Sequence, residues 1–195
     1  MEMAMEKVHI KMSHMIEGLD LKLMNPSEVF DDWEIWYPQT YRPALQLAGY
    51  FDEFSFDRIQ LLGRVECHYL RTLTRETRIE RYSRLLAYKL PCVIFCHKYT
   101  PDEDFLRIAT EKHVPVLCTE TDTAHFNTLI TLWMNEETAP ETRLHGVLVD
   151  VYGEGVLITG DSGMGKSETA LALLKSGHRL VADDIVGSAG SVRTH

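Results

Sequence analysis

The sequence predicts an α/β fold in two parts: an N-terminal α/β domain, followed by the beginning of a domain built around a phosphate-binding loop. Short apolar runs alternate with helix-like polar stretches from about residue 59 onward, a pattern typical of strands joined by helices in a largely parallel sheet. Residues 160–167 read Gly-Asp-Ser-Gly-Met-Gly-Lys-Ser and fit the pattern G-x-x-x-x-G-K-[ST] at every fixed position.

Composition excludes several classes of partner. The chain has 195 residues, is 45% hydrophobic and 25% charged, and resembles ordinary globular proteins. Its net charge of −9 argues against a nucleic-acid-binding surface. No apolar run is long enough to span a bilayer, and residues 1–6 lack the features of a signal peptide. We therefore expect a cytoplasmic protein with neither nucleic acid nor membrane among its partners.

The four cysteines form no C-x-x-C pair. Cys92, Cys96 and Cys118 lie in or beside apolar runs, which favours buried, reduced thiols. The neighbours Cys96 and His97 lack further ligands at metal-site spacing. No metal site is predicted from cysteine.

In the first part of the chain, the sequence pattern that predicts secondary structure is weak at the N-terminus and becomes clearer further along. Residues 8–12 alternate like a short strand, 59–62 form an apolar run ended by Gly63, and a polar helix is expected within 75–90. Residues 92–96 and 114–118 are continuous apolar runs, as in strands covered on both faces. Between them, Thr100 is the expected N-cap of a helix. A further helix is expected at 126–134.

The polar stretch 134–143 is the expected linker between a domain at 1–135 and a domain at 136–195. Residues 145–152 and 156–159 read as two strands around a glycine turn, and 179–183 as a third strand. Residues 187–195 are small, polar and linker-like. About 60 residues after the linker are few for an independent core, so we expect the second domain to be truncated.

The loop at 160–167 lies between an apolar strand and a sequence rich in helix formers, which is the context that phosphate binding requires. Its backbone N–H groups and the helix N-terminus converge on one anion site. Lys166 then reaches the β- and γ-phosphates of a nucleotide, and the Ser167 hydroxyl binds Mg²⁺. The alternative is a glycine-rich turn that merely joins strand to helix.

Asp183 and Asp184 close an apolar strand soon after the helix that follows the loop. In a parallel sheet this strand would run beside the one that feeds the loop, with its carboxyl end at the same edge. One carboxylate could then accept a proton and the other support Mg²⁺, unless both only form a solvated strand end. His145 opens a strand, where a histidine is usually structural, and Glu168 suits a helix N-terminus.

Three blocks closely resemble the HPr kinase/phosphorylase family: residues 143–153, 155–168 and 177–184. Residues 42–43, 49–51 and 58–63 resemble the N-terminal domain of that family. The resemblance runs from about residue 8 to 186. It implies an N-terminal domain followed by a P-loop kinase domain, here truncated.

The resemblance implies a bifunctional bacterial enzyme. Members phosphorylate a seryl hydroxyl of the phosphocarrier HPr with ATP or pyrophosphate and Mg²⁺, remove that phosphate by phosphorolysis, and assemble as hexamers in carbon catabolite regulation. His145, Lys166 and Asp183 match catalytic residues of the family, Asp183 as proton acceptor and, in reverse, donor. Ser167 matches a metal ligand. The ATP-binding loop would comprise Gly160, Asp161, Ser162, Gly163, Met164, Gly165, Lys166 and Ser167.

Beyond residue 186 the family continues with a Mg²⁺-binding glutamate, a catalytic arginine and the helices that dock HPr, which are not present here. We therefore expect little turnover by this polypeptide alone. Two alternatives stay open: a non-catalytic, oligomerising or regulatory fragment, and a small-molecule P-loop kinase.

Overall fold

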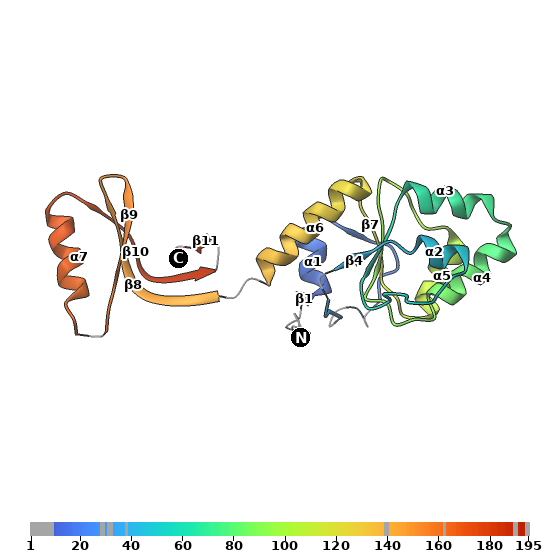
Figure 1. Ribbon diagram of the computed structural model, residues 1–195, viewed down its shortest axis with the longest axis horizontal. Coiled ribbons are helices and arrows are strands. Elements are labelled where there is room, and N and C mark those ends of the chain that lie inside the picture. The colour runs from blue at the N-terminus through green and yellow to red at the C-terminus, as the bar shows by residue number, and fades with distance from the viewer. Residues whose placement is uncertain are drawn as a thin grey trace. The chain divides into compact units, whose positions relative to one another are not determined.

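The computed structural model describes residues 10–27, 30, 33–37, 39–138, 141–161, 163–188 and 191–193. The chain divides into two compact units, of which the first ends at Thr138 and the second begins at residue 139 (Figure 1). Both combine helices with a sheet, so the α/β class is confirmed.

The first unit contains a five-stranded sheet in the order β2-β7-β6-β5-β4. Its strands are β2 (Lys22–Leu23), β4 (Thr40–Tyr41), β5 (Ile59–Leu62), β6 (Val93–Phe95) and β7 (Val116–Cys118). Strands β4 to β7 pair in parallel and β2 is antiparallel to β7, so the largely parallel sheet is confirmed. A separate pair joins β1 (Ile10–Lys11) to β3 (Glu34–Ile35); residues 8 and 9 of the strand expected there lie outside the described residues.

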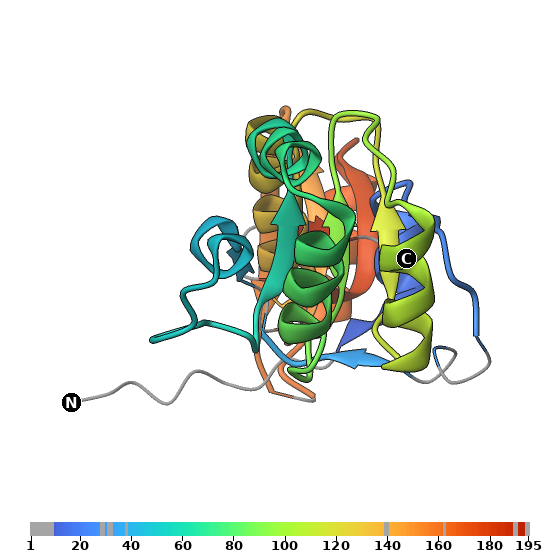
Figure 2. The same ribbon diagram turned by 90° about the vertical axis from the view of Figure 1, so that its right-hand side faces the viewer.

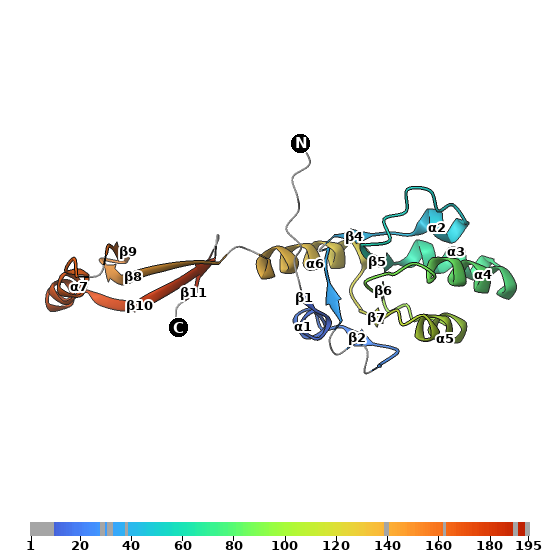
Figure 3. The ribbon, with the colours of Figure 1, turned by 90° about the horizontal axis from the view of Figure 1, so that it is seen from below.

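Helices cover both faces of this sheet (Figure 3). They are α1 (Met12–Gly18), α2 (Ala44–Ala48), α3 (Arg64–Thr72), α4 (Arg75–Leu85), α5 (Glu103–Glu111) and α6 (Thr123–Glu137). Because side chains alternate between the two faces of a strand, Leu62 and Phe95 join one core with α3, α4 and α5. Leu61 and Ile94 join a second core with α1 and α6. Figure 2 shows α4 and α5 in front of the strands that they cover.

An ion pair joins β4 to α3 at the carboxyl ends of the parallel strands. The Glu66 carboxylate accepts two hydrogen bonds from the Arg42 guanidinium, at 3.0 and 2.8 Å, and a third from the Gly63 N–H at 3.0 Å. A Cβ on Gly63 would lie 2.1 Å from Thr123 Oγ1 of α6. Close packing between β5 and α6 therefore requires glycine at this position.

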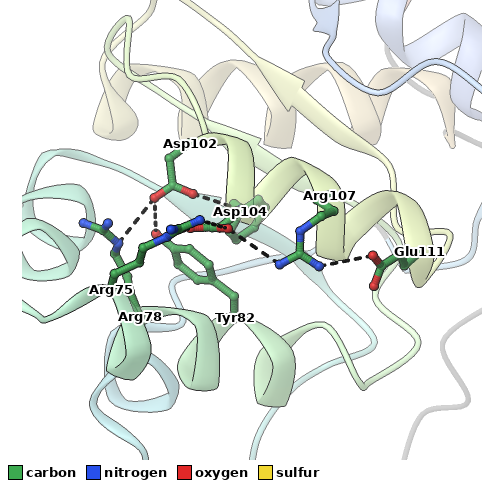
Figure 4. Close-up of polar contacts among 8 residues, drawn as sticks. Arg75, Arg78, Tyr82, Asp102, Asp104, Arg107 and Glu111 are labelled. Carbon is green, nitrogen blue, oxygen red and sulfur yellow. Dashed lines mark hydrogen bonds and ion pairs between the residues drawn. The ribbon is translucent and has the colours of Figure 1, made fainter.

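The helix expected after Thr100 begins later. Asp102 is the N-cap of α5, its Oδ1 accepting from the Phe105 N–H at 2.9 Å. Its Oδ2 accepts from the Tyr82 hydroxyl of α4 at 3.0 Å and lies 3.4 Å from Arg78 Nε (Figure 4). The N-cap prediction was wrong because contacts with α4 favour Asp102 over Thr100.

The second unit contains a four-stranded antiparallel sheet in the order β11-β10-β8-β9. Its elements are β8 (Glu141–Val151), β9 (Glu154–Thr159), α7 (Lys166–Lys175), β10 (Arg179–Ser188) and β11 (Ser191–Arg193). Ala170 of α7 packs against Val147 and Val149 of β8. The side-by-side parallel arrangement of the loop strand and the aspartate strand was wrong, because β8 lies between β9 and β10.

Two other expectations were wrong. The linker expected at 134–143 is mostly regular structure, since α6 continues to Glu137 and β8 begins at Glu141; residues 139 and 140 lie outside the described residues. The last residues, expected to be linker-like, contribute the end of β10 and also β11. Backbone pairing between β10 and β11 organises these small residues as a hairpin. Within the described residues, no helix has the length and apolar character needed to cross a bilayer.

Candidate phosphate-binding site

The order of strand, glycine loop and helix that phosphate binding requires is present in the second unit. Strand β9 ends at Thr159, the loop follows, and α7 begins at Lys166. Gly163 and Gly165 have φ angles of 88° and 82°, in the left-handed region that side chains disfavour. Ser162 lies outside the described residues. The motif glycines let the chain turn tightly into the helix.

Lys166 folds back along this loop. Its ammonium group donates hydrogen bonds to the carbonyl oxygen of Gly160 and, at 3.2 Å, to that of Asp161. Ser167 and Glu168 are exposed in the first turn of α7. The Thr169 hydroxyl donates to the Gly165 carbonyl at 2.9 Å, which ties the helix to the loop. The lysine charge therefore lies beside the N-terminus of α7, where an anion is electrostatically favoured.

The pairing of the strands brings the backbones of the other expected site residues, His145, Asp183 and Asp184, to the end of the sheet where the glycine loop begins. Val147 of β8 pairs with Ile158 of β9 on one side and with Asp183 of β10 on the other. Gly146 pairs with Thr159, the last residue before the loop. Asp183 is thus level with a strand position two residues before Gly160.

A β-bulge lies next to Asp183. Two residues of β8, His145 and Gly146, stand across from the single residue Asp184 of β10, because the pairing shifts between Asp183 and Ile185. Bulges bend a strand and re-aim its residues, and they are common beside functional sites. The backbone positions of His145, Asp183 and Asp184 therefore lie together at the loop end of the sheet.

Sequence reasoning missed Gly146, although a glycine inside an apolar strand is a signal for a bulge or a close backbone approach. A Cβ at this position would lie 2.8 Å from the Ile158 carbonyl oxygen. The opposite end of the hairpin is a tight turn, in which Tyr152 and Gly153 have φ angles of 56° and 87°. Gly153 donates its N–H to Asp150 Oδ1 at 2.7 Å.

The cysteines of the first unit do not form a second site. Burial raises the pKa of the Cys67 and Cys96 thiols to about 12 and that of Cys118 to about 11, so all three are protonated at neutral pH. Protonated thiols are poor nucleophiles and poor metal ligands. Cys96 and His97 belong to no group of three or more metal-ligating side chains within the described part of the chain.

Comparison with protein families gives two adjoining matches. Residues 10–134 match the family model described as HPr Serine kinase N terminus. Residues 136–192 match the model described as HPr Serine kinase C-terminal domain.

Curated relatives agree with these matches. An HPr kinase/phosphorylase of Lachnoclostridium phytofermentans is 42% identical over 177 residues, which cover 91% of this chain and 57% of the relative. One of Clostridium tetani is 41% identical with the same coverage, and one of Alkaliphilus metalliredigens is 46% identical over 74% of this chain and 47% of the relative. The chain thus spans about half the length of the curated relatives that it matches.

Among solved structures, the chain is similar to the CBS and DRTGG domains of the regulatory region of a Clostridium perfringens pyrophosphatase. The TM-score is 0.46 and the identity 17%, over 62% of this chain and 46% of that one. The two family matches and the curated relatives are sufficient by themselves: the chain belongs to the HPr serine kinase family.

Proposed function

We propose that this chain provides the nucleotide-binding part of an HPr kinase/phosphorylase. Such an enzyme transfers a phosphoryl group from ATP or pyrophosphate to a seryl hydroxyl of HPr in carbon catabolite regulation, and removes it by phosphorolysis. Membership of the family supports this activity. The observation that carries the proposal is the register that brings the backbone of Asp183 level with Ile158, two residues before the glycine loop begins.

The phosphate groups of the donor would bind at residues 160–167. Backbone N–H groups of a glycine loop and the N-terminus of α7 suit an anion, and the Lys166 ammonium is already beside them. On binding, Lys166 would exchange the carbonyl oxygens of Gly160 and Asp161 for phosphate oxygens. Charge-assisted bonds to phosphate are stronger than bonds to neutral carbonyls.

Asp183 would accept and donate the proton of the seryl hydroxyl during phosphoryl transfer. In the kinase direction its carboxylate takes the proton of the seryl hydroxyl while the oxygen forms a bond to the γ-phosphorus and ADP leaves. In the reverse direction, an oxygen of inorganic phosphate forms a bond to the phosphorus of phosphoserine while the bond from that phosphorus to the seryl oxygen breaks. Asp183 returns the proton to the departing seryl oxygen, and the pyrophosphate formed is released. His145, at the adjoining bulge, is the third proposed catalytic residue, with Lys166 and Asp183.

The donor atoms suit Mg²⁺, which prefers hard oxygen ligands. The Ser167 hydroxyl in the first turn of α7 is the proposed metal ligand, and the backbone positions of Asp183 and Asp184 are at the same end of the sheet by register. Bound Mg²⁺ would neutralise charge on the phosphates during transfer.

Residues 1–135 would form the N-terminal HPr kinase-like domain and 136–195 the start of the P-loop kinase/phosphorylase domain. The protein partners would be HPr and further copies of the chain in a hexamer, and the compartment the cytoplasm. A non-catalytic fragment would bind no nucleotide, and a small-molecule kinase would label a metabolite in place of HPr.

Isothermal titration with ATP, with and without Mg²⁺, tests the proposal. We expect saturable binding that is tighter with Mg²⁺ and that Lys166→Ala weakens by about a hundredfold, since two charge-assisted contacts are lost. Lys175→Ala, at the opposite end of α7, is the matched control and leaves the affinity unchanged. Absence of binding, or equal effects of both variants, would contradict the proposal.

A further inference from the structure

A cavity lies in the first unit at the edge of the sheet where the parallel strands begin. Its volume is about 630 Å³, within the range of about 300–1,000 Å³ that is usual for small-molecule sites. The connections that enter β5, β6 and β7 form three of its sides, and the segment around β3 forms the fourth.

Aromatic rings dominate the lining. The rings of Phe56 and Tyr88 lie 5.5 Å apart, and Tyr88 also stacks on Phe51 at 5.7 Å. Trp33 is fixed by its indole N–H, which donates to the Pro91 carbonyl at 2.8 Å. The lining includes five aromatic side chains: Trp33, Trp36, Tyr37, Phe56 and Tyr88. Flat, fixed rings around one cavity are suited to stacking on a flat ligand.

The charged residues of the lining favour an anionic group. Lys89 and Lys112 are exposed, and within the described residues neither side chain pairs with a carboxylate. Two acidic residues also line the cavity, but Glu34 stands directly opposite Lys11 in the β1–β3 pair. Among the described residues of the lining, the remaining balance is two lysines against Asp57, which is net positive.

We propose that this cavity binds a small molecule that carries both a flat aromatic ring and an anionic group, of the size of a mononucleotide. The ring stacks among the tryptophan and tyrosine side chains, and the anionic group lies between Lys89 and Lys112. The site is separate from the phosphate loop of the second unit, and the inference does not depend on the proposed function.

Titration of the full chain with AMP, followed by tryptophan fluorescence, tests the inference. Two of the three tryptophans, Trp33 and Trp36, line the cavity, so bound adenine should quench their emission saturably. The double variant Lys89→Gln/Lys112→Gln should weaken AMP binding about tenfold or more while adenosine binding is unchanged. Both lysines are exposed, so the fold is retained.

Two controls locate the binding. Lys98→Gln changes an exposed lysine beyond the carboxyl end of β6, and Lys166→Ala changes the phosphate loop; neither should alter the quenching by AMP. No saturable quenching up to about 10 mM AMP would overturn the inference. So would equal AMP affinity in the wild type and the double variant, because the lysines would then only offset the C-termini of α4 and α5. Loss of quenching in Lys166→Ala would also overturn it, by assigning the binding to the loop.

Discussion

Asp183 and Ile158 lie level with each other in the sheet of the second unit, because both pair with Val147 of β8, from opposite sides. Ile158 is two residues before Gly160, where the glycine loop begins. Strands β9 and β10 both run antiparallel to β8 and therefore point in the same direction. This register is the basis for the proposal that Asp183 acts on a phosphate held by the loop after β9, although the two strands are not neighbours.

The bulge beside Asp183 depends on Gly146. Gly146→Ala should destabilise the second unit by about 1–3 kcal/mol, because the new Cβ would lie 2.8 Å from the Ile158 carbonyl oxygen. Gly155→Ala in the same hairpin is the control, since its Cβ would meet only Leu148 Cδ1 at 3.8 Å. Amide hydrogen exchange of β8 and β9 measures the effect. Equal exchange in the two variants would show that the close approach does not matter.

Glu66 should be the most sensitive charged residue of the first unit. Its side chain is 1% exposed and holds both Arg42 and the Gly63 N–H, so Glu66→Ala should cost about 3–5 kcal/mol of unfolding free energy. Arg75→Ala is the control: Arg75 makes a comparable two-bond contact with Asp104, at 2.7 and 3.0 Å, but its side chain is 70% exposed. Urea unfolding should show little change for Arg75→Ala. A similar loss in both variants would contradict this ranking.

Because of the buried thiols, the free energy of unfolding should fall as pH rises in the alkaline range. Burial raises the pKa of Cys67 and Cys96 from 9.0 to about 12. Above about pH 9 the unfolded chain loses these protons first, so the folded state binds more protons and its stability falls as pH rises toward 12. Urea unfolding of the wild type from pH 8 to pH 11 should show the decline, and Cys67→Ala/Cys96→Ala should make it shallower. If the free energy of unfolding falls with pH as steeply in the double variant as in the wild type, the thiols of Cys67 and Cys96 are not the cause of the decline.

Ser167 should link Mg²⁺ to nucleotide affinity. Ser167→Ala should weaken ATP binding about tenfold when Mg²⁺ is present and leave it unchanged without the metal, because only the metal contact is removed. Ser176→Ala is the control, since that hydroxyl donates to the Ala172 carbonyl at the far end of α7. Titration calorimetry in both conditions measures the difference. Equal weakening with and without Mg²⁺ would mean that Ser167 does not bind the metal.

Much of the first unit could be predicted because its central strands are short apolar runs covered on both faces. Strands β6 and β7 fall within the expected runs at 92–96 and 114–118. Helix α3 was missed, because most of its residues are polar and the apolar residues on its buried face, Cys67 and Leu70, are too few to give a clear helical pattern. Asp102 displaced Thr100 as N-cap through contacts with another helix, which no local pattern reveals.

In the second unit the loop and α7 were predictable from the motif, but the order of the strands was not. A helix between two strands usually indicates neighbouring parallel strands, and here β8 lies between them. The bulge at His145 and Gly146 depends on the pairing of β8 with β10, which is set by contacts distant in sequence. The identities of the site residues came from the motif and the resemblance, and their catalytic roles stay proposals.

The most direct test of the account is the rate at which Lys166 reacts with an amine-modifying reagent, measured by mass spectrometry with and without Mg²⁺ and ATP. If the loop binds a nucleotide, Mg²⁺-ATP should slow the modification of Lys166 severalfold and leave Lys175, at the other end of α7, unaffected. Equal rates at Lys166 with and without Mg²⁺-ATP would contradict the account.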